Sequence, residues 1–119
     1  MLLSFALVAA LAAPADSVSG TWVLKGEVAG NPLNTTCTLA VAEAKISGVC
    51  KGADGKELPI VGEVKEGKVI FEHGGDYNGQ ELKIIYTGTL PSAKEMVGTI
   101  DVKPFDVTGE FTATPAPKS

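Results

Sequence analysis

Residues 37–50 read CTLAVAEAKISGVC, and this stretch decides the fold. Apolar side chains alternate with other residues on both sides of Glu43-Ala44, a pattern typical of two strands joined by a two-residue turn. In that register Cys37 faces Cys50, and the apolar residues of both strands lie on the same side. The spacing therefore predicts an antiparallel hairpin with a Cys37–Cys50 disulfide, as in exported proteins. A metal or redox pair would need a CxxC spacing or further ligands.

A second pattern recurs along the chain, in which a glycine stands midway between two apolar residues of a predicted strand. The glycine lies on the apolar face, where it usually marks a bend, a bulge or a close backbone approach. We interpret the repetition as a sheet that curls on itself, with these glycines in structural roles. The copies are centred on Gly26, Gly48, Gly62, Gly88, Gly98 and Gly109.

Eight strand candidates follow one another with no helical stretch between them. Short connections favour antiparallel neighbours, and a meander with one apolar face needs closure or a second layer. The sequence therefore predicts an all-β fold, an eight-stranded antiparallel up-and-down β-barrel, with a β-sandwich as the alternative. The candidates cover residues 20–29, 36–42, 45–51, 57–65, 68–73, 81–90, 95–103 and 107–114.

The connections between these candidates separate into two ends. Tight turns at 43–44, 66–67 and 91–94 mark one end. Longer loops over 29–35, 52–56, 74–80 and 104–106 are predicted at the other. A ligand in the lumen of the barrel is expected to enter at this looser end.

The chain begins with an apolar run that predicts export. Residues 2–13 are apolar apart from Ser4, and Ala13-Pro14-Ala15 has the form of a signal-peptidase site. The run is too short for a membrane span, so we expect a secreted or periplasmic protein that does not span a membrane. The predicted organisation is a signal peptide over 1–15, a single β-barrel domain over 16–114 and a flexible tail over 115–119.

The charge composition disfavours nucleic-acid partners. The chain has 10 basic residues, all of them Lys, against 14 acidic ones, for a net charge of -4. Without Arg it has no bidentate fork for phosphate or guanine, and its sign is unfavourable for a phosphate backbone. We therefore expect no nucleic-acid binding.

Three motifs carry a resemblance to a known group. Gly20-Thr21-Trp22 opens the first strand, residues 62–71 read GEVKEGKVIF, and residues 86–90 and 98–100 read YTGTL and GTI. The chain resembles small secreted bacterial calycin-like β-barrels of unknown function, of the lipocalin and avidin type. The resemblance implies the barrel, with Gly20 and Trp22 in structural roles. It implies no particular ligand, because lipocalins and fatty-acid-binding proteins use an Arg that this chain lacks.

The inward aromatic residues are the candidate ligand contacts, with plain core packing as the alternative. They would line the lumen together with His73, the only histidine, which closes the fifth predicted strand. Catalysis would need a nucleophile and an orienting group beside His73, and the sequence supplies neither, so we expect no enzyme. We also expect no metal and no cofactor. The candidate lumen residues are Phe71, His73, Tyr77, Tyr86 and Phe111.

These observations lead to two functional hypotheses. The first is an exported, non-enzymatic β-barrel that binds a small apolar or amphipathic ligand in its lumen. The alternative is a filled barrel that acts through its outer surface as an interaction module of the envelope. In the second case Val61, Ile70 and Ile85 are candidates for a shared outer patch. We expect a monomer or a weak homodimer.

Overall fold

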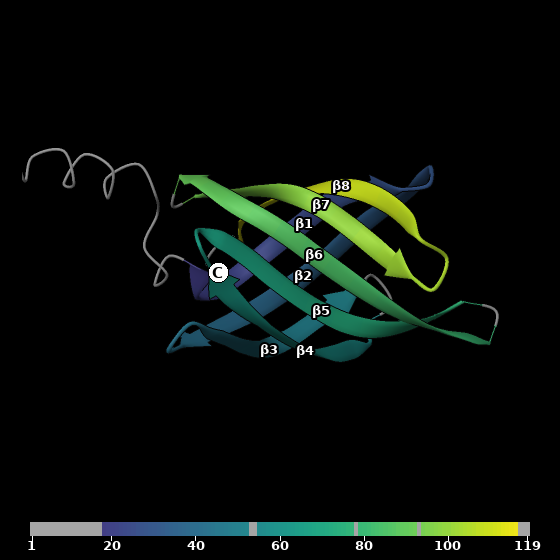
Figure 1. The fold of residues 1–119 in the computed structure, drawn as a ribbon, viewed down its shortest axis with the longest axis horizontal. Helices are drawn as coiled ribbons and strands as arrows, with labels where there is room; N and C mark the ends of the chain where they lie inside the picture. The colour runs from purple at the N-terminus through teal and green to yellow at the C-terminus, as the bar shows by residue number, and fades with distance from the viewer. Residues whose placement is uncertain (1–17, 53–54, 78, 93, 117–119) are drawn as a thin grey trace, which may run out of the picture.

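A computed structural model describes residues 18–52, 55–77, 79–92 and 94–116 (Figure 1). The predicted signal peptide over 1–15 lies outside the described residues. The chain forms a closed barrel in which each strand pairs antiparallel with the next and the last pairs with the first. The all-β barrel prediction is confirmed, and the sandwich alternative is wrong. The strands are β1 (Gly20–Val28), β2 (Asn31–Ala42), β3 (Lys45–Gly52), β4 (Glu57–Lys65), β5 (Lys68–Tyr77), β6 (Gln80–Ser92), β7 (Glu95–Lys103) and β8 (Val107–Pro115).

The hairpin over residues 37–50 has the predicted register. Cys37 pairs with Cys50 across β2 and β3, and the two sulfur atoms form a disulfide. Glu43 and Ala44 both have positive φ angles, 51° and 67°, as a tight two-residue hairpin turn requires. The alternation of apolar residues and the cysteine pair were therefore sufficient to set this pairing.

The glycines on the inner face allow neighbouring strands to approach closely. A Cβ atom at Gly48 would collide with the Thr38 carbonyl oxygen, and one at Gly98 would collide with the Thr87 carbonyl oxygen. A Cβ atom at Gly62 would likewise collide with the Ile70 carbonyl oxygen. Such glycine kinks let a sheet bend sharply enough to close. These three positions therefore make room for backbone and not for a ligand.

Gly88 and Gly20 have different surroundings. A Cβ atom at Gly88 would lie 3.1 Å from Met96 Cγ and 3.2 Å from Phe111 Cζ, so this glycine makes room for core side chains. Gly20 has nothing within 4 Å of its Cβ position, but its φ of 134° is one that other residues rarely adopt.

Two of the predicted long loops are instead strands. β1 and β2 stay paired up to a turn at Ala29-Gly30, and β5 pairs with β6 as far as Tyr77 opposite Gln80. Pairing continues there because backbone hydrogen bonds do not need an apolar face. These segments are polar and rich in Gly and Asn because they form hairpin ends that project beyond the core (Figure 1). Their composition therefore wrongly indicated loops. At the third predicted loop, β3 ends at Gly52 and β4 begins at Glu57.

At the other boundary, β8 runs to Pro115, and the Ala116 N–H donates to the Thr21 carbonyl at 2.9 Å. The barrel therefore continues slightly beyond the predicted domain limit at residue 114. Within the described part of the chain, no helix has the length and hydropathy of a membrane span.

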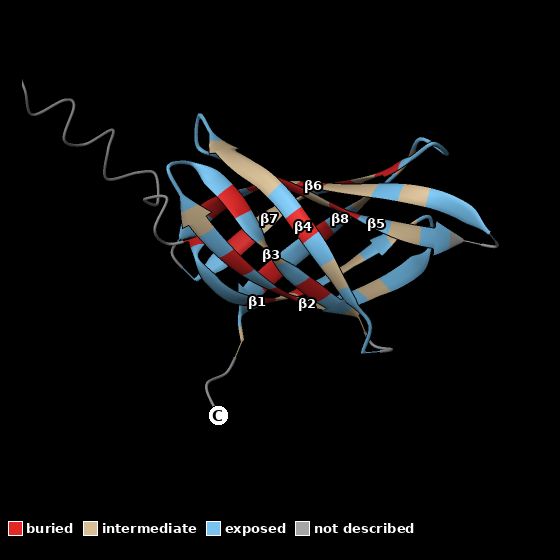
Figure 2. Cartoon of the chain, turned by 90° about the horizontal axis from the view of Figure 1, so that it is seen from below, coloured by how far each residue is buried: buried red, intermediate tan, exposed pale blue. Residues whose placement is uncertain are grey.

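The two ends of the barrel differ in how they are filled. At the end with the tight turns, Val18 is buried and its carbonyl accepts a 2.8 Å hydrogen bond from Trp22 Nε1. Buried residues continue from there through the middle, whereas the tips of the other end are exposed (Figure 2). We call the filled part the closed half and the remainder the open half. The closed half is built around Trp22, Leu39, Val69, Phe71, Tyr86, Met96 and Phe111, all buried.

Candidate functional site

The barrel wall separates between β4 and β5 in the open half. These strands pair only from Val61–Lys65 to Lys68–Glu72. Beyond that point, β4 continues alongside β3 alone and β5 alongside β6 alone. Pro59 lies in the separated part of β4 and has no N–H group to donate to a neighbour, which favours the break. Two strand edges therefore face each other without pairing.

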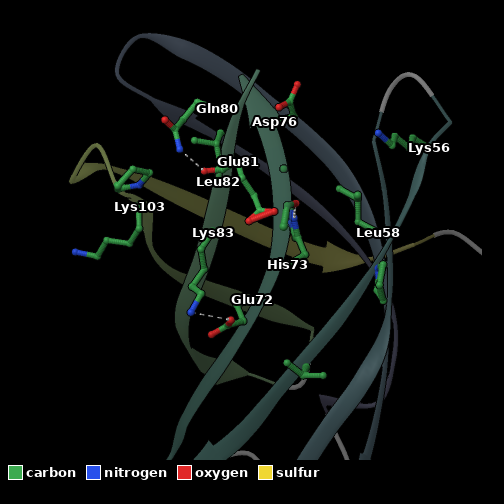
Figure 3. A pocket seen from close by; sticks show the side chains of 15 residues that line it. Lys56, Leu58, Glu72, His73, Asp76, Gln80, Glu81, Leu82, Lys83 and Lys103 are labelled. Atoms are coloured by element: carbon green, nitrogen blue, oxygen red, sulfur yellow. Dashed lines mark hydrogen bonds and ion pairs between the residues drawn. The ribbon is translucent and has the colours of Figure 1, made fainter. Parts of the chain in front are cut away.

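A cleft of about 1060 Å³ occupies this separation (Figure 3). Leu58 on β4 and His73 on β5 lie on its two sides. Three lysines and three carboxylates line the cleft, so its charges balance. The charged residues are Lys56, Lys83, Lys103, Glu72, Asp76 and Glu81.

Two of these lysines have identified acidic partners. Lys83 Nζ lies 3.7 Å from Glu72 Oε2 on the outer face. Lys103 Nζ lies 2.7 Å from Asp106 Oδ1, and this hydrogen bond raises the pKa of Lys103. The cleft is therefore polar at its outer edge without a strong excess of either charge.

His73 is held by two hydrogen bonds at the point where β4 and β5 part. Its Nδ1 donates to the Gly74 carbonyl at 2.7 Å, since a carbonyl can only accept. In the neutral ring Nε2 is then the acceptor, and the Tyr86 hydroxyl donates a hydrogen bond to it at 2.9 Å. Burial lowers the pKa of His73, and the hydrogen bond to Gly74 opposes this effect by raising it. Burial raises the pKa of Tyr86. Both nitrogens are engaged in holding the fold.

Three of the predicted lumen residues form an aromatic cluster in the closed half. The Phe71 and Tyr86 rings stack with centroids 4.8 Å apart, and the Phe111 ring meets Tyr86 edge-on at 5.5 Å. Phe71 and Tyr86 are fully buried, and His73 joins the cluster through Tyr86. The structure therefore brings these four together as packed core. The side chain of the fifth, Tyr77, lies outside what the structure describes.

Above this cluster, the open half contains a cavity of about 400 Å³ at the mouth of the barrel. Aliphatic side chains that are only partly buried form most of its wall, and Phe105 stands at the rim with 49% exposure. Alternation predicts inward positions here, but it does not distinguish a packed position from one beside empty space. The aliphatic lining is Val28, Leu33, Leu82, Ile84, Ile100, Val102 and Val107.

The predicted outer patch is interrupted by a charged residue. Glu72 is the cross-strand neighbour of both Val61 and Ile85, and it forms an ion pair with Lys83. Ile70 pairs instead with Glu63 and Thr87. Val61, at 63% exposure, is therefore separated from Ile85 by a carboxylate.

Metal-ligating side chains do not gather in the described ranges: no group of three or more His, Cys, Asp or Glu is placed to hold an ion. The chemistry of the open half is therefore that of an aliphatic cavity beside a polar cleft.

Comparison with known proteins identifies the architecture. No family model matches the chain, and no curated protein matches it. Among solved structures, the redesigned β-barrel b11L5F_LGL aligns with a TM-score of 0.68 and 14% identity, over 86% of this chain and 94% of that one.

Two further redesigned β-barrels, each solved bound to DFHBI, also align. One, mFAP1, has a TM-score of 0.65 and 14% identity, over 83% of this chain and 95% of that one. The other, mFAP0, has a TM-score of 0.61 and 14% identity, over 82% of this chain and 98% of that one. At this level of identity, the likeness establishes the fold alone. The chain is thus similar in fold to these redesigned β-barrels.

Proposed function

We propose that the protein is an exported, non-enzymatic β-barrel that binds a small apolar or amphipathic molecule in its open half. The observation that carries the proposal is the mouth cavity, whose aliphatic lining is left partly exposed above a fully packed aromatic cluster. Exposed apolar surface that is concave is typical of small-molecule sites. The similar barrels bound to DFHBI support the idea that this architecture accepts a compact ligand.

Export is supported by the apolar N-terminal run and by the disulfide, which persists in oxidising compartments. A non-enzymatic role is supported by His73, whose two nitrogens are both committed to Gly74 and Tyr86. The hydroxyl that Nε2 accepts from belongs to Tyr86, which is fully buried and whose pKa is raised by burial, so the pair presents no reactive oxygen to a substrate.

A fluorescent probe tests the proposal directly. We expect 1-anilinonaphthalene-8-sulfonate, an amphipathic dye, to bind the folded barrel saturably with one dye per chain. Val107→Phe adds a ring to the wall of the mouth cavity, and it should weaken dye binding by about ten-fold, equivalent to about 1.4 kcal/mol.

Val49→Phe is the matched control, because Val49 is 37% exposed and does not line the cavity. It should leave dye affinity unchanged. Circular dichroism melting of both variants verifies that each is folded. Equal affinities of the two variants, or an absence of saturable binding by the unaltered barrel, would contradict the proposal.

A further inference from the structure

The mouth cavity and the cleft between β4 and β5 meet at one side chain. Leu82 lines both spaces. Gly75, on β5 beside it, lines the cleft, and its Cβ position lies 3.1 Å from Ile84 Cδ1 and 3.8 Å from Leu82 Cβ. Ile84 in turn lines the mouth cavity. The missing side chain of Gly75 therefore lies where the two spaces adjoin.

Gly75 differs from the glycines of the closed half in what surrounds it. At Gly48 and Gly98 an added Cβ would collide with the backbone of a neighbouring strand. At Gly75 it would meet only side-chain atoms, the nearest being the end of Ile84. Strand packing does not require a glycine there. Its absent side chain makes room for the ends of Ile84 and Leu82, which lie where the cavity and the cleft adjoin.

The cleft offers hydrogen bonds more than charge. The separated parts of β4 and β5 present backbone edges to each other, and the unpaired edge of a strand carries N–H donors and C=O acceptors. Its three lysines and three carboxylates balance. His73 adds no free nitrogen. These features suit an uncharged group that both donates and accepts, such as a hydroxyl or an amide.

We infer that the two spaces form one site for an elongated, uncharged amphiphile. Its apolar part occupies the mouth cavity, and its hydrogen-bonding end lies in the cleft between β4 and β5. Gly75 is the specificity-determining residue, because a larger side chain there would force the ends of Ile84 and Leu82 into the space between the two arms of the site. This inference rests on the proposed function and specifies the class of ligand.

The test compares two probes that use different parts of the site. Ethylbenzene needs only the mouth cavity, whereas glycerol monolaurate, used below its micelle-forming concentration, needs both arms. Gly75→Val should weaken glycerol monolaurate binding by about ten-fold in calorimetric titration and weaken ethylbenzene binding much less. Ala40→Val is the control, since Ala40 is exposed on β2 and lines neither space. It should leave both affinities unchanged, with both variants melting as folded proteins.

Each other outcome has a distinct meaning. If Gly75→Val and Ala40→Val bind glycerol monolaurate equally, or if Gly75→Val loses both probes equally, the two-arm site is refuted while the mouth cavity stands. Tighter binding of dodecanoate or dodecylammonium than of glycerol monolaurate would overturn the uncharged end. Failure of the unaltered barrel to bind either probe would overturn the proposed function itself.

Discussion

The closed and open halves of this barrel are built from the same alternating strands, but side chains fill one half and leave space in the other. In the closed half, glycines admit neighbouring backbone and a stacked Phe71–Tyr86 pair fills the lumen. In the open half, β4 and β5 separate and the aliphatic lining stays partly exposed. The difference shows that closure and filling are separate properties. One half supplies the stability that allows the other to keep an unfilled space.

The strongest test of this contrast places one substitution in each half. Gly98→Ala puts a methyl group against the Thr87 carbonyl, where the backbone must shift, and should lower the free energy of unfolding by about 3 kcal/mol. Gly75→Ala meets only the movable end of Ile84 and should change it by less than about 1 kcal/mol. Urea denaturation measures both. Equal losses would show that the open half is packed as strictly as the closed half.

A smaller effect is expected at the turns. Ala44, at the closed end, has a φ of 67°, which costs an L-residue about 1–2 kcal/mol. Ala44→Gly should therefore stabilise the protein by about 1 kcal/mol, as read from the urea midpoint. Ala29 has a φ of 51° in the turn at the open end. If that hairpin end opens before the barrel unfolds, Ala29→Gly should stabilise the protein by less than Ala44→Gly does.

Ala42→Gly is the control for both turn variants, because Ala42 is exposed at the end of β2 and has no positive φ. It should be destabilising, by about 0.5–1 kcal/mol. A gain at Ala29 as large as that at Ala44 would indicate that both ends unfold together with the barrel.

The smallest effect concerns the residue at the boundary of the halves. Burial lowers the pKa of His73, so the unfolded chain takes up this proton at a higher pH than the folded one. Stability should be fully present above the ordinary histidine pKa of about 6.5 and should decline as the pH falls from there toward the lowered folded value. Tyr86, the titratable group that contacts His73, stays protonated throughout because its pKa is raised.

His73→Gln provides the comparison, since an amide can both donate to the Gly74 carbonyl and accept from Tyr86. The unfolding free energy of the His73→Gln variant should therefore depend less steeply on pH below about 6.5. Parallel pH profiles for the two proteins would mean that His73 is as easily protonated in the fold as in the unfolded chain.

Much of the closed half could be predicted from local patterns. Gly62 lies opposite Phe71, and Gly88 opposite Gly98, as turn positions and alternation required. The close backbone approaches were also foreseeable, since a glycine on the apolar face of a strand commonly makes room for a neighbouring backbone. Hairpin register propagates along the strands, so one correct turn sets many pairs.

The open half was less predictable for a physical reason. The register of the β4–β5 hairpin would place Ile60 opposite His73, yet pairing stops at Val61 and Glu72. Pro59 favours this ending, but where the ladder stops also depends on the bending of the whole sheet, which no short stretch of sequence records. The mouth cavity depends likewise on volume left between distant strands. Alternation marks Leu82 and Ile84 as inward but does not show that they border empty space.

The disulfide has an optical consequence. Trp22 is the only tryptophan of the chain and is the cross-strand neighbour of Cys37. A disulfide close to an indole quenches its emission. The tryptophan fluorescence of this protein therefore comes from the closed half, and we expect its intensity to rise when the Cys37–Cys50 bond is reduced. The molecule thus carries its own spectroscopic reporter, positioned in the half that the proposed ligand does not reach.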